Sequence, residues 1–329
     1  MMTKQLLRTG IALAALHCSA FAFAKGDGWT ADYSAAKKEA ASSKKDLLID
    51  FTGSDWCGWC IKLNEEVFSH APFKDGVKDK FVLVELDYPK DKTILSEGTL
   101  KQNEELAKKY PIKGYPTILL CDAEGKPFAA TGYQPGGPEA YVKSLDELRA
   151  KKAVRDESFA SASKGTGVDK AKALVAGLDA MGLEDGMVQS FYGDIVEQIK
   201  ASDPKDETGF AKAAAAKGRL LEFQNALGEF AQKQDFEGAL SLVDKTLQEG
   251  GFQTEDTQQM MITRAMIFAQ QKKLDDAIKA LDEAKAFAPD TPMAASIDEF
   301  KGQLEGAKAK AAEAPPEAKA AEAKVEDKN

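Results

Sequence analysis

Two cysteines separated by two residues are the part of this sequence best suited to chemistry. Cys57 and Cys60 belong to the stretch Trp-Cys-Gly-Trp-Cys at positions 56–60. Thiol–disulfide exchange needs one thiolate that attacks and a second sulfur, within one helical turn, that resolves the mixed disulfide. We therefore predict a redox-active pair in which Cys57 attacks and Cys60 resolves.

The elements predicted around the pair favour these roles. Residues 47–51 form a short apolar run typical of a buried strand, and residues 60–68 carry apolar side chains at helical spacing. Cys57 thus lies where a strand passes into a helix. The free N–H groups and the positive dipole end of a helix stabilise a thiolate there. We predict that Cys57 ionises more readily than a free cysteine.

Three other interpretations apply to a lone pair of this kind. A closed zinc site takes four ligands, and beyond residue 24 the sequence adds only Cys121 and His70 as further soft ligands. A structural disulfide across so short a loop gains little chain entropy. A redox fold that has lost its partner reaction is the third alternative and stays open. Exchange through the two cysteines itself requires no metal and no organic cofactor.

Three motifs occur together in this sequence: the strand that ends at Asp50 and Phe51, the Trp-Cys-Gly-Trp-Cys stretch, and Gly-Tyr-Pro-Thr at positions 114–117. In this combination they resemble the thioredoxin-fold family. The resemblance covers roughly residues 29–150 and is closest to secreted thioredoxin-like proteins with a Gly-Ser-Asp-Trp-Cys loop. It implies an α/β domain with a central mixed sheet flanked by helices.

The same resemblance implies further site residues. A cis proline, Pro116, would face the disulfide and help to hold the substrate chain, with Tyr115, Trp56 and Trp59 around it. Asp50 would be the buried carboxylate that accepts the proton of the resolving cysteine. Trp59 replaces the usual proline between the cysteines, so a redox potential does not carry over. The loop after Asp50 is one residue longer than in thioredoxin, so a solvated aspartate at the loop edge is the alternative there.

The remaining elements complete this domain. We predict strands at 81–86, 117–121 and 128–133 and helices at 32–45, 100–110 and 138–152. The strands at 47–51 and 81–86 flank a helix as a βαβ unit, and the strands at 117–121 and 128–133 form a hairpin. Cys121 is interpreted as a small buried apolar residue rather than a third redox thiol. His70 is interpreted as a solvated loop residue.

Residues 1–24 have the pattern of a bacterial-type secretory signal. Lys4 and Arg8 precede an apolar stretch that ends in Ala-Phe-Ala at positions 22–24. The stretch is too short and too interrupted for a stable membrane span. We predict cleavage after Ala24 and a periplasmic or secreted protein, whose oxidising surroundings favour a redox role for the cysteine pair.

Beyond residue 152 the strand signals end. Residues 153–307 show helical periodicity broken at glycine, proline and aspartate, which predicts an all-α domain. Residues 232–244 and 270–282 are similar to each other, and Ala-Phe-Ala-Pro at positions 286–289 weakly resembles the end of a tetratricopeptide repeat, whose stacked helix pairs offer a groove to a protein partner. Generic helical packing is the equal alternative. Residues 308–329 contain few large apolar residues, which predicts a disordered tail.

Composition sets limits on function. The chain has 329 residues, 43% of them hydrophobic, which is enough for about two domains, and its formal charge of −9 argues against nucleic acid as a partner. The leading hypothesis is a thiol–disulfide oxidoreductase that acts on protein thiols and disulfides and is recharged by an unidentified redox partner. The alternative is a helical-repeat binding protein whose thioredoxin fold serves for docking. The direction of exchange depends on the redox potential and on that partner.

Overall fold

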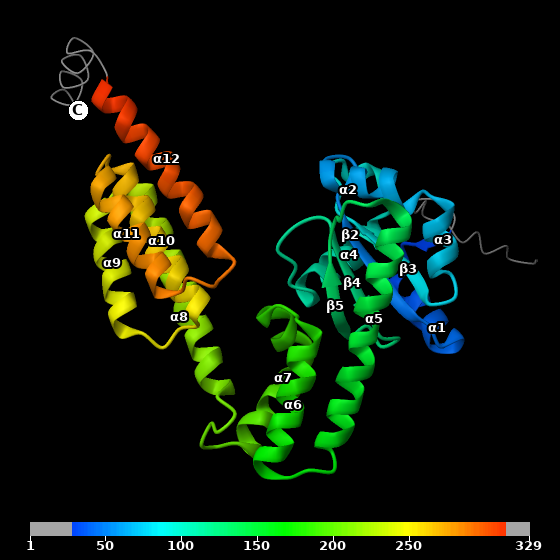
Figure 1. The fold of residues 1–329 in the computed structure, drawn as a ribbon. Helices are drawn as coiled ribbons and strands as arrows, with labels where there is room; N and C mark the ends of the chain where they lie inside the picture. The colour runs from blue at the N-terminus through cyan, green and yellow to red at the C-terminus, as the bar shows by residue number, and fades with distance from the viewer. Residues whose placement is uncertain (1–27, 314–329) are drawn as a thin grey trace, which may run out of the picture. The chain divides into compact units, whose positions relative to one another are not determined.

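The computed structural model describes residues 28–313, and the chain divides into two compact units after Thr208 (Figure 1). The first unit holds a five-stranded sheet with helices around it, and the second is built of helices. The predicted signal at 1–24 and most of the predicted tail lie outside the described residues. Between residues 28 and 313, no helix has the length and apolar character needed to cross a membrane.

The sheet of the first unit is mixed, as predicted. Its strands are β1 (Trp29–Thr30), β2 (Asp46–Thr52), β3 (Phe81–Asp87), β4 (Thr117–Cys121) and β5 (Pro127–Thr131). They stand in the order β1-β3-β2-β4-β5. The first three are parallel, β4 runs antiparallel to β2, and β5 runs antiparallel to β4. The predicted βαβ unit followed by a hairpin is therefore confirmed.

The two central parallel strands are buried along their whole length. All seven residues of β2 and all seven of β3 are buried. Strands covered on both faces have nearly continuous apolar sequences rather than alternating ones, which explains why the apolar run at 47–51 predicted β2. β2, a central strand, ends at Thr52, and the cysteine loop begins directly after it.

Helices flank this sheet. They are α1 (Tyr33–Ser43), α2 (Gly58–Leu63), α3 (Ala71–Val77), α4 (Glu97–Lys109), α5 (Gly137–Ala162), α6 (Gly167–Met181) and α7 (Asp185–Ser202). A π-helical turn continues α2, and a 3-10 turn precedes α4. The side chains of Asp32 and Ser96 cap α1 and α4 by accepting backbone N–H groups. α1 packs on β2 and β3, whereas α5 packs on α3 and β5.

The first unit extends further than the sequence predicts. The predicted domain boundary after Lys152 falls inside α5, which continues to Ala162. α6 packs against α5, and α7 packs against α6 (Figure 1). In α7 the hydroxyl of Tyr192 donates to the Pro127 carbonyl over 2.8 Å, at the start of β5. α6 and α7 therefore belong to the same compact unit as the sheet.

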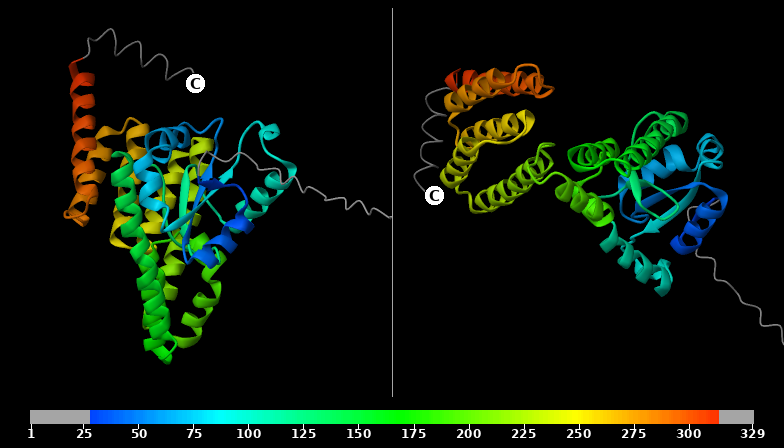
Figure 2. Two further views of the ribbon diagram at one scale, coloured as in Figure 1. Left: turned by 90° about the vertical axis from the view of Figure 1, so that its right-hand side faces the viewer. Right: turned by 90° about the horizontal axis from the view of Figure 1, so that it is seen from below.

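The second unit contains α8 (Phe210–Lys233), α9 (Phe236–Glu249), α10 (Thr254–Gln270), α11 (Leu274–Phe287) and α12 (Met293–Glu313). Helices that follow one another in sequence pack together, and the views in Figure 2 show α9 to α12 stacked side by side. Two apolar clusters form its core, one around Val243 and Met260 and the other around Leu281 and Ile297. The predicted all-α character of this region is confirmed.

The two similar segments of the second unit adopt the same turn. Gln234 and Lys272 both have a left-handed backbone, with φ of 54° and 59°, and each precedes a helix, α9 or α11, by two residues. The sequence similarity therefore coincides with a structural one at this turn. Its resemblance to a tetratricopeptide repeat stays a prediction. α12 continues to Glu313, past the predicted end of the helical region at residue 307.

Candidate active site

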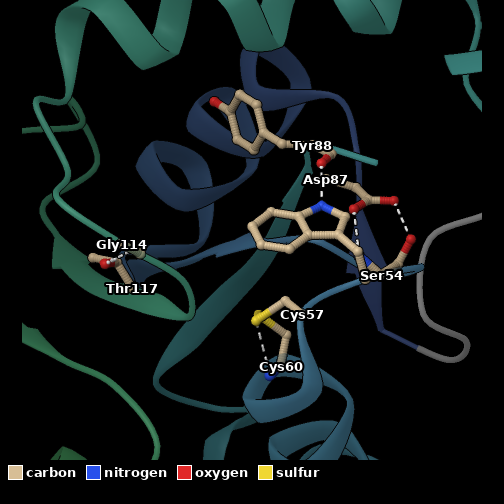
Figure 3. Close-up of a disulfide and its surroundings, with 8 residues drawn as sticks. Ser54, Cys57, Cys60, Asp87, Tyr88, Gly114 and Thr117 are labelled. Atoms are coloured by element: carbon tan, nitrogen blue, oxygen red, sulfur yellow. Dashed lines mark hydrogen bonds between the residues drawn. A yellow bond between two sulfur atoms is a disulfide. The ribbon is translucent and has the colours of Figure 1, made fainter. Parts of the chain in front are cut away.

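Cys57 and Cys60 form a disulfide with an S–S distance of 2.13 Å (Figure 3). Cys57 has an extended backbone and caps the N-terminus of α2, and the N–H of Cys60 donates to its sulfur over 3.2 Å. Cys57 thus occupies the predicted position between a strand and a helix. The two cysteines are 6% and 2% exposed, so a substrate must reach Cys57 past the side chains around it.

The loop from β2 to α2 holds Cys57 through its own backbone. The N–H of Cys57 donates to the carbonyl of Gly53 over 2.9 Å. A Cβ atom on Gly53 would lie 2.5 Å from the indole of Trp56. Glycine at this position therefore leaves room for the tryptophan ring directly before the first cysteine.

Two of the predicted docking residues are in contact. Trp56 is 40% exposed, and its ring centroid lies 5.5 Å from that of Tyr115 in an edge-to-face arrangement. The peptide bond from Tyr115 to Pro116 is cis, which confirms the predicted cis proline. Thr117 pairs with Phe51 of β2, so this segment lies beside the start of the cysteine loop (Figure 3).

Trp59 belongs to a second aromatic group. It is 57% exposed, and its ring centroid lies 5.0 Å from that of Tyr133. The Lys62 ammonium lies 5.2 Å and 5.0 Å from the centroids of these two rings, and the Tyr133 hydroxyl donates to Glu66 over 2.7 Å. These neighbours of Trp59 were not predicted from the sequence. Only the i,i+4 spacing of Lys62 and Glu66 could have indicated part of the group.

Asp50 is a buried residue of the sheet. It lies in β2, is 1% exposed, and pairs in register with the buried Glu85 of β3. It is therefore not the solvated aspartate at the loop edge that the sequence left as an alternative. Burial, and then the charge of Asp50, raise the pKa of Tyr141 in α5 above its usual value. Glu85 is a second buried acid here that the sequence analysis did not single out.

The other two candidate ligands are separate from the disulfide. Cys121 is a fully buried residue of β4, as the sequence predicts, and burial raises the pKa of its thiol well above the usual value. His70 is exposed, and a ring nitrogen lies 2.9 Å from the backbone carbonyl of Glu65. Across residues 28–313, histidine, cysteine, aspartate and glutamate side chains form no cluster of three suited to a metal ion.

Comparison with known proteins places this site in a family. Residues 33–148 match the family model described as a thioredoxin-like domain. The disulfide bond reductase DsbH of Chlamydia pneumoniae is 36% identical over 113 residues, which make up 34% of this chain and 68% of the relative. The chain belongs to the thioredoxin-like family. The predicted family and fold class are thereby confirmed for the first unit.

Further relatives match the thioredoxin-like part. The thioredoxin-related protein DsbJ of Chlamydia pneumoniae is 35% identical over 96 residues, which are 29% of this chain and 27% of that protein. A solved DsbH oxidoreductase matches with a TM-score of 0.35 and 31% identity, covering 44% of this chain and 93% of the other. The oxidised C-terminal domain of Neisseria meningitidis DsbD matches with a TM-score of 0.25 and 15% identity, covering 34% and 89%.

Family membership and local geometry together establish the chemistry of the thioredoxin-like unit. Its two site cysteines are bonded to each other, and the first stands at the start of α2 with a backbone N–H directed at its sulfur. A paired cysteine in this position is the arrangement that thiol–disulfide exchange uses. The thioredoxin-like protein is a thiol–disulfide oxidoreductase.

Proposed function

We propose that this thioredoxin-like protein reduces disulfides of protein substrates in an extracytoplasmic compartment, with Cys57 as the attacking sulfur and Cys60 as the resolving sulfur. The observation that carries the proposal is the hydrogen bond from the N–H of Cys60 to the sulfur of Cys57 at the start of α2. In the reduced protein, this donor and the helix N-terminus stabilise negative charge on Cys57. The thiolate is the form that attacks a disulfide.

Each catalytic cycle delivers two electrons to the substrate. The Cys57 thiolate attacks one sulfur of a substrate disulfide. A bond between Cys57 and the substrate forms, the substrate S–S bond breaks, and the released thiolate takes up a proton. Cys60 then loses its proton and attacks the sulfur of Cys57, which forms the Cys57–Cys60 disulfide and releases the second substrate thiol. A dithiol redox partner reduces the pair by the reverse exchange and is itself oxidised to a disulfide.

We propose that Asp50 accepts the proton that Cys60 loses when it attacks the sulfur of Cys57. Burial makes an ionised carboxylate costly, and Asp50 is buried in β2 beside a second buried acid, Glu85. Taking up a proton removes the buried negative charge of such a carboxylate. The Cys60 thiol can supply that proton when it is lost in the resolving step. This supports Asp50 as the acceptor in the resolving step.

We assign the docking of the substrate chain to Trp56, Trp59, Tyr115 and Pro116. One tryptophan stands directly before each cysteine, and both side chains are exposed. Tyr115 contacts Trp56, and Pro116 follows it through the cis bond. Exposed aromatic side chains provide much of the binding energy at protein interfaces.

The direction and location of the reaction rest on separate support. The relative that is 36% identical bears the name disulfide bond reductase, which favours the reductive direction. The charged start, the apolar stretch and the Ala-Phe-Ala at 22–24 favour export. An oxidising compartment makes a steady supply of electrons from a redox partner necessary. We also propose that the helices of residues 209–313 bind a protein partner, because α9 and α11 follow the same left-handed turn, as stacked repeats of helix pairs would.

Trapping of a mixed disulfide tests the two cysteine roles. Cys60→Ser, incubated with a disulfide-containing protein such as insulin, should accumulate a mixed disulfide through Cys57, because nothing resolves it. Cys57→Ser should form none. Cys121→Ala is the matched control and should behave as the unchanged protein does. Trapping by Cys57→Ser but not by Cys60→Ser would reverse the assignment.

Equilibration of the pair with glutathione tests the direction. A reduction potential near about −270 mV, as in thioredoxin, supports the reductase, and one near about −120 mV opposes it. The alternative docking function makes a different prediction. Protein partners should then bind equally well to Cys57→Ser, and the unchanged protein should reduce no protein disulfide.

A further inference from the structure

Three consecutive residues before Cys57 are hydrogen-bonded to the segment 87–91, which begins at the last residue of β3. The N–H and the hydroxyl of Ser54 donate to the Asp87 carboxylate over 2.9 Å and 2.6 Å. The indole N–H of Trp56 donates to the carbonyl of Tyr88 over 2.9 Å (Figure 3). The residue between them, Asp55, makes the most extensive backbone contact of the three.

Asp55 accepts two backbone hydrogen bonds with its carboxylate. One oxygen receives the N–H of Lys90 and the other receives the N–H of Asp91, each over 2.9 Å. These bonds hold the pKa of the Asp55 carboxyl below its usual value. The side chain is exposed and contributes nothing to the apolar core. Its structural effect is therefore to fasten the far end of the 87–91 segment to the cysteine loop.

The near end of the 87–91 segment is fixed to the body of the first unit. The side-chain amide of Asn103 in α4 donates to the Asp87 carbonyl over 2.8 Å, and the Tyr88 hydroxyl donates to the Asn103 carbonyl over 2.8 Å. The N–H of Tyr88 donates to the Thr52 carbonyl at the end of β2, also over 2.8 Å. The segment thus provides a firm attachment for Trp56.

The Trp56 indole is held on several sides although it remains 40% exposed. Its ring lies against Gly53, with no room for a Cβ atom between them. Tyr115 meets it edge to face at 5.5 Å, and the Lys90 ammonium lies 5.7 Å from its centroid. An exposed side chain that is already held loses little conformational entropy when a partner binds it.

We propose that Asp55 is a positioning residue for protein substrates: it fastens Lys90 and Asp91 to the cysteine loop and so holds the exposed Trp56 indole ready for docking. The proposal rests on the proposed function, because it assumes that protein chains dock beside Cys57. In this role Asp55 acts through Trp56 and contacts neither the sulfur atoms nor the docked chain. The rate at which the protein reduces a small disulfide, which reaches Cys57 without using Trp56, should therefore not depend on Asp55.

Steady-state kinetics with two substrates test this role. Asp55→Ala removes both acceptors, and Asp55→Asn keeps one carbonyl acceptor in the same shape. Asp75→Ala is the matched control, because Asp75 is an exposed aspartate of α3 that pairs with Lys78. Each variant is assayed for reduction of insulin and of a small aromatic disulfide, and the reduction potential of the cysteine pair is measured in a glutathione buffer.

Asp55→Ala should raise KM for insulin about three- to tenfold, the cost of ordering one or two side chains on binding. Its kcat and its rate with the small disulfide should stay within about twofold of the unchanged protein, and its reduction potential should not change. Asp55→Asn should give an intermediate KM, and Asp75→Ala should change nothing. In the NMR spectrum, the indole N–H signal of Trp56 should broaden or shift in Asp55→Ala and stay unchanged in Asp75→Ala.

Results of two kinds would overturn the proposal. An equal loss of kcat/KM with insulin and with the small disulfide, or a shifted reduction potential, would show that Asp55 acts on the reactivity of the cysteines instead. An unchanged KM for insulin in Asp55→Ala would show that docking does not use this contact. Failure of the proposed function is distinct from both, because the unchanged protein would then reduce the small disulfide but not insulin.

Discussion

The guanidinium of Arg155 lies 3.1 Å from the carboxylate of Asp122, and both side chains are buried. Asp122 follows β4, whereas Arg155 belongs to the part of α5 beyond Lys152. The same guanidinium donates to the hydroxyl of Tyr192 in α7 over 2.9 Å. Burial raises the pKa of Tyr192 to about 12, so this hydroxyl stays neutral and also donates to the Pro127 carbonyl. One buried cation therefore joins the sheet to α5 and α7.

Replacing Arg155 with alanine should destabilise the first unit by about 3–5 kcal/mol, because Asp122 would remain as an uncompensated buried charge. Urea unfolding followed by tryptophan fluorescence measures this effect. The signal reports the first unit alone, since all three tryptophans, at positions 29, 56 and 59, belong to it.

Arg149→Ala is the control for this prediction. Arg149 pairs with Asp46 over 2.7 Å, but Asp46 keeps a second partner in Lys152 at 2.5 Å. Arg149 is also partly exposed, so its removal should cost about 1 kcal/mol or less. Equal losses of unfolding free energy in the two variants would show that the buried pair of Arg155 and Asp122 stabilises the first unit no more than the pair of Arg149 and Asp46.

A fragment that ends at Thr208 should fold and exchange disulfides, whereas one that ends at Lys152 should be much less stable. The shorter fragment lacks Arg155 and Tyr192, so the buried Asp122 loses its ion-pair partner and the sheet loses its contact with α7. Circular dichroism during urea unfolding compares the two. The same urea midpoint for both fragments would place the domain boundary after Lys152, as the sequence predicts.

Cys121 should not react with iodoacetamide in the folded protein. It is fully buried, and burial followed by the charge of Asp122 raises the pKa of its thiol well above the usual value, so the reactive thiolate is scarce. Brief alkylation of the reduced protein and mass spectrometry should find Cys57 labelled first and Cys121 labelled only after urea is added. Early labelling of Cys121 would mean that β4 opens readily.

The hydrogen bonds of Asp55 should make the first unit sensitive to acid. The N–H groups of Asp91 and Lys90 lower the pKa of the Asp55 carboxyl from its usual 3.8. A pKa lowered by folding adds stability above the unfolded value, and this stability is lost as the pH falls through the folded value. Asp55→Asn should therefore lower the urea midpoint at pH 7, with the difference from the unchanged protein shrinking below about pH 4. A constant difference at both pH values would rule out a contribution from ionisation.

Features that depend on nearby residues could be predicted. The two-residue spacing of Cys57 and Cys60, the apolar run at 47–51 and the helical periodicity of α9 and α11 all involve residues within a few positions of one another. Strand and helix periods are local properties of a chain. The cis bond at Pro116 is a different case, because it followed from resemblance to the thioredoxin fold rather than from the residues themselves.

Contacts between distant residues could not be predicted in this way. Register between β2 and β3 sets Glu85 beside Asp50, and the turn after β3 brings Lys90 to Asp55. No periodicity in the sequence indicates such contacts, because these contacts depend on how the elements pack together. The continuation of α5 past Lys152 had the same cause, since only the folded sheet supplies Asp122 to Arg155. The sequence by itself therefore determined the reacting pair and the order of the elements, and tertiary packing decided which side chains surround that pair.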